Sequence, residues 1–246
     1  MSWINKLPLG TIINMTTVII GSCIGLLLQK VFPSNIEAII FQAIGLGTLV
    51  IGITMSLKVP DGYFLIFIFS LIMGGIIGEI LGVDAFLLSA SEYLKSTLNI
   101  GGERFSEGLI TAFLLFCIGS MTIVGAIEEG LQGKRELLLI KSTLDGIVSI
   151  AFASTYGIGV MFSIIPMLIF QGGITVLAKQ LERLFVPIII DNISACGGAL
   201  IIGIGINMLK LGSINLENLL PSILVVFILS YAKYRGVIKG FKRLEG

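Results

Sequence analysis

The stretch GYFLIFIFSLIMGGIIGEILG at residues 62–82 contains a single charged side chain, Glu79. A transmembrane helix needs about 20 mainly apolar residues, so this stretch predicts one membrane span. Short polar joints separate it from further windows of the same kind. The eight spans expected from these windows lie at 9–29, 36–57, 62–82, 107–127, 137–156, 158–178, 187–208 and 218–234. The sequence therefore predicts an all-α, polytopic transmembrane helical bundle.

The composition indicates that lipid is the main solvent of the chain. The 246 residues are 55% hydrophobic and 13% charged, with a mean hydropathy of +1.04, whereas soluble domains carry about 25% charged residues. The chain has no histidine, and Cys23, Cys117 and Cys196 lie in apolar windows without C-x-x-C spacing. We therefore expect small buried cysteines, no metal site and no cofactor. The net charge of +1 favours no nucleic-acid partner.

The positions of Lys and Arg predict the orientation in the membrane. With eight spans and the N-terminus inside, twelve of these side chains lie in inner segments and four in outer segments, in agreement with the positive-inside rule. We expect a multi-pass protein of the cell (inner or plasma) membrane, with both termini cytoplasmic and a basic tail at 235–246. Residues 84–100 are too short and too polar to span, and their apolar face predicts an interfacial amphipathic helix.

Two segments of similar sequence predict an internal repeat. Residues 44–55 read IGLGTLVIGITM and residues 195–206 read ACGGALIIGIGI, which align at an offset of 151. Equivalent spans are five apart, so they cross the membrane in opposite directions, as in the inverted repeats of secondary transporters. The expected organisation is repeat one at 9–83, an inserted hairpin at 107–156 and repeat two at 158–234. The alternative is a chance alignment of glycine and β-branched residues.

Three motifs relate the chain to a known family. They are SEGLITAFLLFCIGSMTIVGAIEEGL at 106–131, KSTLDG at 141–146 and FASTYGIG at 152–159. The sequence resembles, over essentially its whole length, the bacterial membrane-protein family catalogued as domain of unknown function 554. The resemblance implies a bacterial inner-membrane protein, loosely described as a transport protein. It implies neither a substrate nor functional residues.

The leading candidate site lies in ELLLIKSTLDGIVSIAFAST at residues 136–155. Lys141 and Asp145 are four residues apart and share a helix face, with Ser142 beside them. At 1.5 Å per residue, Asp145 is about 13 Å from the helix start, near the membrane midplane. A carboxylate there can take up a proton or a cation, and Lys141 can keep it ionised or neutralise it. The alternative is an internal ion pair that only fixes helix packing, with Lys141 snorkelling.

Further candidates for a solute or ion site are polar residues of other spans. Asp191 and Asn192 begin span seven, and Asn14, Gln171 and Asn207 add uncharged donors and acceptors. Together they predict a polar path. The alternative for each uncharged residue is a single interhelical hydrogen bond, worth about 0.6 kcal/mol.

Glycines in spans two and seven allow two interpretations. They either break the helices in mid-membrane to expose backbone groups to an ion, or they allow close helix packing. The residues concerned are Gly45, Gly47, Gly197 and Gly198. A second set, with four-residue spacing, predicts either internal packing or a homodimer contact: Gly21 and Gly25, and Gly74, Gly78 and Gly82. Finally, Glu128 and Glu129 beside Lys134 and Arg135 predict a solvated salt-bridge cluster.

These features together predict a secondary transporter of a small solute or ion. It would work by alternating access, with proton or cation coupling at Asp145. A passive channel and a non-transporting structural or regulatory membrane protein are the alternatives. No catalytic motif is present, so no enzyme is expected, and an intramembrane protease would need Asp145 and Asp191 to meet. The expected partners are the lipid bilayer, a small solute or ion, and in one alternative a second copy of the chain.

Overall fold

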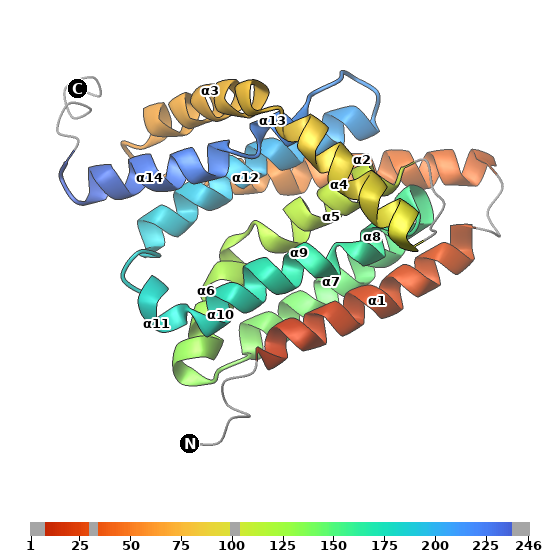
Figure 1. Ribbon diagram of the computed structural model, residues 1–246, viewed down its shortest axis with the longest axis horizontal. Helices are drawn as coiled ribbons and strands as arrows, with labels where there is room; N and C mark the ends of the chain where they lie inside the picture. The colour runs from red at the N-terminus through yellow and green to blue at the C-terminus, as the bar shows by residue number, and fades with distance from the viewer. Residues whose placement is uncertain (1–7, 30–33, 99–103, 238–246) are drawn as a thin grey trace.

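The computed structural model describes residues 8–29, 34–98 and 104–237, which form helices and no strand (Figure 1). The elements are α1 (Leu9–Gln29), α2 (Ser34–Ser56), α3 (Phe64–Leu81), α4 (Val83–Leu98), α5 (Phe105–Cys117), α6 (Ser120–Gln132), α7 (Glu136–Tyr156), α8 (Gly159–Phe162), α9 (Ile164–Met167), the π-helical turn η2 (Leu168–Gly172), α10 (Gly173–Val176), α11 (Ala178–Leu181), α12 (Pro187–Met208), α13 (Leu216–Leu219) and α14 (Ser222–Tyr234). The tail at 235–246 lies mostly outside the described residues.

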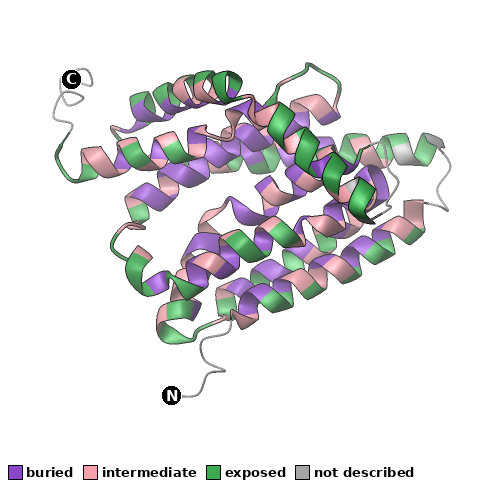
Figure 2. Ribbon diagram, in the orientation of Figure 1, coloured by how far each residue is buried: buried purple, intermediate pink, exposed green. Residues whose placement is uncertain are grey.

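Length and apolar composition confirm the helical membrane bundle. Seven helical stretches of the described chain are long and apolar enough to cross a membrane, and the bent pair α5–α6 makes up to eight. The segment predicted at 84–100 is a separate helix, α4, and Figure 2 shows it mostly exposed. Its position at the membrane surface stays a prediction.

Span four is not the single straight helix expected at 107–127. It consists of α5 and α6, bent by 62°. At the bend Gly119 is extended, with φ −166° and ψ 154°, and Ile118 also leaves the helical region. The Thr122 hydroxyl donates to the Phe116 carbonyl at 3.0 Å. The break exposes helix-end groups, because the last carbonyls of α5 and the first N–H groups of α6 lack the partners that a continuous helix supplies.

The glycines of spans two and seven do not break their helices. Both α2 and α12 run continuously through them, so the helix-break interpretation is wrong. A Cβ on Gly198 would lie 2.8 Å from the Gly52 carbonyl oxygen, one on Gly45 would lie 3.0 Å from Leu209, and one on Gly197 would clash with Ile118. Three of the four glycines thus permit close packing. Gly47 has no neighbour within 4 Å of a Cβ position.

Helix α1 lies along α7 in the closest pairing of the bundle (Figure 1). A Cβ on Gly21 would clash with Ser149 and with the carbonyl of Gly146, and one on Gly25 would clash with the carbonyl of Ile150. The Thr17 hydroxyl donates to the Ser142 carbonyl at 2.8 Å. The small-residue stripe of α1 therefore serves packing within the chain.

The second glycine stripe also packs internally. Gly74 and Gly78 of α3 face Ser222 and the carbonyl of Asn218, which begin and precede α14. Gly82 has a different role, since its left-handed backbone (φ 61°) ends α3, where glycine is favoured. The homodimer predicted as an alternative use of these stripes stays a prediction.

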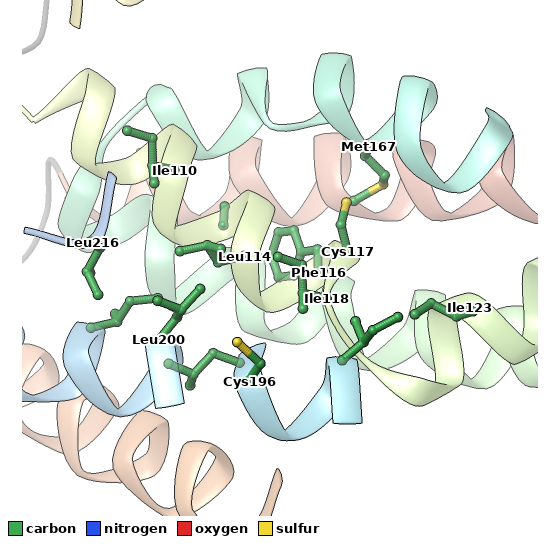
Figure 3. Close-up of a cluster of buried hydrophobic side chains, with 14 of the residues drawn as sticks. Ile110, Leu114, Phe116, Cys117, Ile118, Ile123, Met167, Cys196, Leu200 and Leu216 are labelled. Carbon is green, nitrogen blue, oxygen red and sulfur yellow. The ribbon is translucent and has the colours of Figure 1, made fainter. Parts of the chain in front are cut away.

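The core is centred on α12, which lies between the other helices and is largely buried in Figure 2. Its neighbours are α2, α14 and the bent pair α5–α6. Figure 3 shows Cys117, Phe116 and Ile118 of the bend against Cys196 and Leu200 of α12. Two of the three cysteines are buried apolar residues as expected. The third, Cys23, is exposed on α1, because it lies on the face of α1 opposite Gly21 and Gly25.

We predict that Gly21→Ala lowers the stability of the protein, whereas Gly47→Ala does not. Both changes replace a glycine inside a helix, so both gain about 1 kcal/mol of helix propensity. At Gly21 the new methyl group has no room beside Gly146 and Ser149, and overpacking costs about 1–3 kcal/mol. Thermal unfolding of the purified variants in detergent checks this. Equal midpoints for the two variants would contradict the close α1–α7 contact.

Candidate functional site

A buried ion pair lies at the centre of α7. The Lys141 ammonium is 2.8 Å from Oδ1 and 2.7 Å from Oδ2 of Asp145. The exposed fractions of the two residues are 7% and 5%, and Asp145 lies near the middle of a 21-residue helix. The pair expected from the four-residue spacing is therefore formed. It is deep in the bundle rather than snorkelling to an end.

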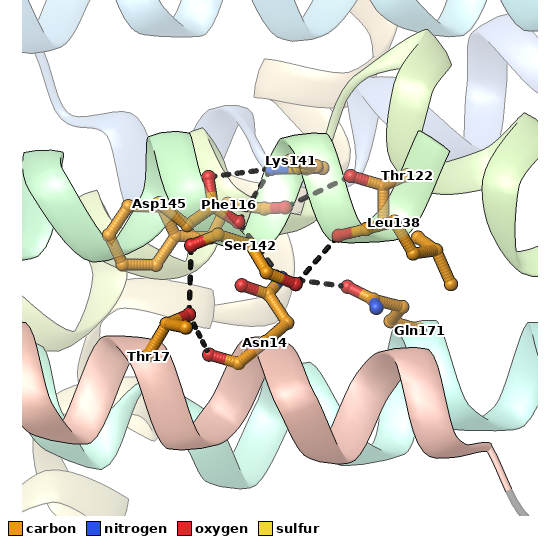
Figure 4. Close-up of polar contacts among 9 residues, drawn as sticks. All are labelled: Asn14, Thr17, Phe116, Thr122, Leu138, Lys141, Ser142, Asp145 and Gln171. Atoms are coloured by element: carbon orange, nitrogen blue, oxygen red, sulfur yellow. Dashed lines mark hydrogen bonds and ion pairs between the residues drawn. The ribbon is translucent and has the colours of Figure 1, made fainter. Parts of the chain in front are cut away.

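Two amide side chains from other spans complete the cluster. Nδ2 of Asn14 on α1 donates to Asp145 Oδ2 at 2.9 Å and to Gln171 Oε1 at 3.2 Å (Figure 4). Gln171 lies in η2, and both amides are fully buried. We call Asn14, Lys141, Asp145 and Gln171 the central polar cluster. It joins residues 131 and 157 positions apart in the chain.

Ser142 has only a supporting role beside this cluster. Its hydroxyl donates to the Leu138 carbonyl of its own helix at 2.6 Å. Its backbone carbonyl accepts from Thr17, whose hydroxyl also donates to the Asn14 carbonyl at 2.8 Å. Ser142 thus fixes the position of α1 against α7 and holds Asn14 at the height of Asp145.

Two atoms of the cluster have no hydrogen-bond partner among the described residues. They are Asn14 Oδ1, an acceptor, and Gln171 Nε2, a donor, and both are buried. A buried polar atom without a partner costs about 1–3 kcal/mol. The cluster therefore retains one acceptor and one donor that can bind a small polar group, or that can be used when the side chains rearrange.

Irregular backbone surrounds the cluster on two sides. Gln171 is part of a π-helical turn, and such turns occur frequently at functional sites. The bend between α5 and α6 packs against α7, and Figure 4 shows its residues Phe116 and Thr122 with the ion pair. The ends of the two half-helices carry partial charges of opposite sign. Discontinuous helices of this kind form ion sites near the midplane in transporters.

Sequence reasoning missed both irregular elements. The signal for the bend was the dipeptide Gly119–Ser120 inside an apolar window, which combines a flexible residue with a residue favoured at helix starts. The π-helical turn has no comparable signal. Pro166 lies just before it, but a proline predicts a kink or an interruption and not the type of turn that follows.

Besides Ser142, three predicted site residues lie outside the cluster. Asp191 is half-buried, and no hydrogen bond or ion pair connects it with the cluster in the described part of the chain. Asn192 is buried and donates to the Ile188 carbonyl of its own helix at 2.8 Å. Asn207 both donates to the Ile214 carbonyl and accepts from the Ile214 N–H, at 2.8 Å each. Asn207 therefore closes the loop after α12.

The predicted solvated salt-bridge cluster is wrong for Glu129. This residue is 3% exposed. Its Oε1 accepts from the backbone N–H of Gly10 at 2.8 Å and from Arg135 Nε at 2.7 Å. The carboxylate thus binds the N-terminus of α1, where the helix dipole favours negative charge. Glu129 fixes α6, the second half of the bent span, to α1 and to the turn before α7.

Three cavities of the described structure lie away from Asp145 and do not include it in their lining. One of 40 Å³ contains Glu107, Thr111, Tyr156 and Glu217. One of 260 Å³ lies between α2, Arg104 and the end of α12. The third, an apolar groove of 380 Å³, runs beside η2. The four residues of the central polar cluster are themselves at most 7% exposed.

Comparison with known proteins assigns the family. The family model described as "Protein of unknown function (DUF554)" matches residues 9–231. The chain belongs to this family. The match covers every helix of the bundle up to Tyr231 in α14, so the central polar cluster lies wholly within the region that defines DUF554.

Two bacterial relatives match along nearly their full length. "Uncharacterized membrane protein YdfK" of Bacillus subtilis (strain 168) is 36% identical over 219 residues, which cover 88% of this chain and 93% of that protein. "Uncharacterized protein YqgA" of Escherichia coli (strain K12) is 30% identical over 229 residues, covering 91% and 97%. No solved structure matches the chain. The relatives confirm the family and support a multi-pass membrane protein.

We predict that removing one partner of the ion pair costs more stability than removing both. Lys141→Met or Asp145→Asn leaves one polar or charged group unpaired in the core, which costs about 3–5 kcal/mol. In the double variant no charge is left unpaired. It should therefore lose less stability than the sum of the losses in the two single variants. Thermal unfolding in detergent measures this, with exposed Glu136→Gln on the same helix as the control. Additive losses would show that the pair is not coupled.

Proposed function

We propose that the protein is a secondary transporter that moves a small solute or ion by alternating access, with a proton or cation coupled at Asp145. The observation that carries this proposal is the buried Asp145 carboxylate at the middle of α7, which accepts from Lys141 of the same helix and from Asn14 of α1, while Asn14 also donates to Gln171 of η2. Ionisable residues inside a membrane bundle are costly, and they typically mark ion pathways or proton relays.

The chemistry of the cluster suits a carboxyl group that changes its charge. With Asp145 ionised, it accepts from Lys141 and from Asn14 Nδ2. When Asp145 takes up a proton, its O–H needs an acceptor, and the unused Oδ1 of Asn14 reaches it if the amide turns over,. A neutral Asp145 also releases Lys141. Uptake of a proton or a cation thus changes the hydrogen bonds of Gln171 in the π-helical turn.

The packing of the helices supports the proposed inverted repeat of spans one to three and six to eight. Span two (α2) pairs with span seven (α12), and span three (α3) pairs with span eight (α13 and α14). Span one (α1) pairs with span five (α7), and the bent span four (α5 and α6) pairs with span six (α8 to α10). The proposed repeat exchanges span one with six, two with seven, three with eight and four with five. Under this exchange the pairs two–seven and three–eight map onto themselves, and the pair one–five maps onto the pair six–four. Inverted repeats of this kind are common in alternating-access transporters.

The remaining features of the proposal follow from the sequence. We place the protein in the cell membrane with both termini in the cytoplasm, because of the Lys and Arg bias. A homodimer remains an alternative assembly. That the chain has no enzymatic activity also stays a prediction.

We predict that Asp145→Asn abolishes proton-coupled solute uptake. The test uses proteoliposomes with an entrapped pH-sensitive dye, an imposed pH gradient, and a panel of carboxylates, phosphate, amino acids, sugars and alkali cations. Solutes that change the dye signal of the wild type should lose this effect in Asp145→Asn, because the neutral amide cannot take up a proton. Asp191→Asn is the matched control, since this carboxylate is outside the cluster.

Three other results would each exclude part of the proposal. Unchanged coupling in Asp145→Asn would exclude the coupling role of this carboxylate. Solute flux that only equilibrates and never accumulates would indicate the passive channel. A wild type without flux for any member of the panel would favour the structural or regulatory alternative.

A further inference from the structure

A cavity of 260 Å³ lies at the end of the bundle opposite the start of α1. Three segments far apart in the sequence line it: the first half of α2, Arg104 just before α5, and Met208–Lys210 at the end of α12. These are the ends of the helices at the right of Figure 1. The cavity is separate from the central polar cluster, and the coupling mechanism does not use it.

Two cations face this cavity, and no acidic residue is among its lining residues. The described ion pairs of the chain are Arg135–Glu129 and Lys141–Asp145, so neither Arg104 nor Lys210 forms a salt bridge within the described structure. Glu107, three residues after Arg104, attracts the guanidinium only as a nearby charge. The Arg104 guanidinium lies 5.2 Å from the centre of the Phe41 ring, a distance typical of cation–π contacts. Phe41 thus holds Arg104 at the wall, while its N–H donors remain available.

Lys210 directly follows the C-cap of α12 and has the left-handed backbone that commonly ends a helix,. Its φ of 57° is left-handed, and Lys210 is the one residue other than glycine with positive φ in the described chain. This conformation costs about 1–2 kcal/mol for a residue with a Cβ, whereas glycine adopts it freely. Two backbone bonds that close α12 offset this cost, since the N–H of Lys210 donates to the Asn207 carbonyl at 3.1 Å and the N–H of Leu211 to the Ile206 carbonyl at 3.0 Å. The helix end thus fixes Lys210 beside the cavity, where its positive charge is also favoured by the helix dipole.

A contact between two rings separates this cavity from the smaller acidic one. Phe41 and Tyr156 meet edge to face with ring centres 5.7 Å apart. Beyond Tyr156, the 40 Å³ cavity contains Glu107 and Glu217. A negative group would therefore be attracted to the Arg104–Lys210 side and repelled from the far side of the ring pair.

We propose that the Arg104–Lys210 cavity binds an anionic group, the carboxylate or phosphate of a small molecule. Arg forms two parallel hydrogen bonds with such groups, and Lys adds a point charge. Gln42 contributes a neutral amide at the same wall. The volume is below the 300–1,000 Å³ typical of drug-sized ligand sites, so the bound group is small. The same chemistry is offered by a free solute and by the headgroup of an anionic lipid.

The test measures anion binding by the full-length protein in a neutral detergent at constant ionic strength. Inorganic phosphate and succinate are titrated while the midpoint of thermal unfolding is followed. At least one of them should stabilise the wild type, and Arg104→Gln and Lys210→Asn should each weaken its binding about tenfold, the loss expected for one charged hydrogen bond. Asparagine tolerates the left-handed backbone at residue 210, so this variant should remain folded. The exposed Lys179→Gln in α11, away from the cavity, is the matched control.

A second arm distinguishes the source of the anion. Wild type and variants are placed in nanodiscs of phosphatidylcholine with or without phosphatidylglycerol. If phosphatidylglycerol stabilises the wild type and competes with phosphate or succinate, the group is a lipid headgroup; if only the soluble anions bind, it is a free solute. The proposal is overturned if neither kind of anion stabilises the wild type, if both cavity variants bind as the wild type does, or if Lys179→Gln weakens binding equally. None of these results depends on solute flux or on Asp145.

Discussion

The buried pair of Lys141 and Asp145 is the constraint around which the other helices are arranged. Charges in a membrane interior are tolerated when they are paired and when further hydrogen bonds satisfy their remaining atoms. One helix cannot supply these bonds alone. Asn14 must come from α1 and Gln171 from span six. The close α1–α7 contact follows from this requirement, because Asn14 reaches Asp145 only if glycines let the two backbones approach.

The second constraint is that every backbone group within the membrane needs a partner. In contact with lipid, only continuous helices satisfy it, and irregular backbone is tolerated where protein surrounds it. Both irregular elements obey this rule. The α5–α6 bend lies between α7 and α12, where Ile118 is 2% exposed, and the π-helical turn faces α1 and α6. These two irregular elements lie beside the ion pair, where their end charges have polar neighbours.

The sequence predicted what depends on local pattern and missed what depends on packing. Apolar length identified the spans, and the four-residue spacing of Lys141 and Asp145 predicted their pairing, because both properties belong to one helix. Which glycines break a helix depends instead on neighbours. Gly198 has the backbone of α2 against it and stays helical, while Gly119 is extended. Glu129 was misjudged for the same reason, since its partner Gly10 is 119 residues away.

The arrangement combines rigid and adaptable parts around one charge. The α1–α7 and α2–α12 pairs are locked by glycine contacts in which even a methyl group has no room, so each pair must move as a unit. The bend at 118–119 and the turn η2 lack such regular bonding and can change their backbone at lower cost. Asp145 belongs to a rigid pair, but through Asn14 it is bonded to Gln171 in an adaptable element. The change of charge proposed for Asp145 would therefore reach, through Asn14, the part of span six that can alter its shape.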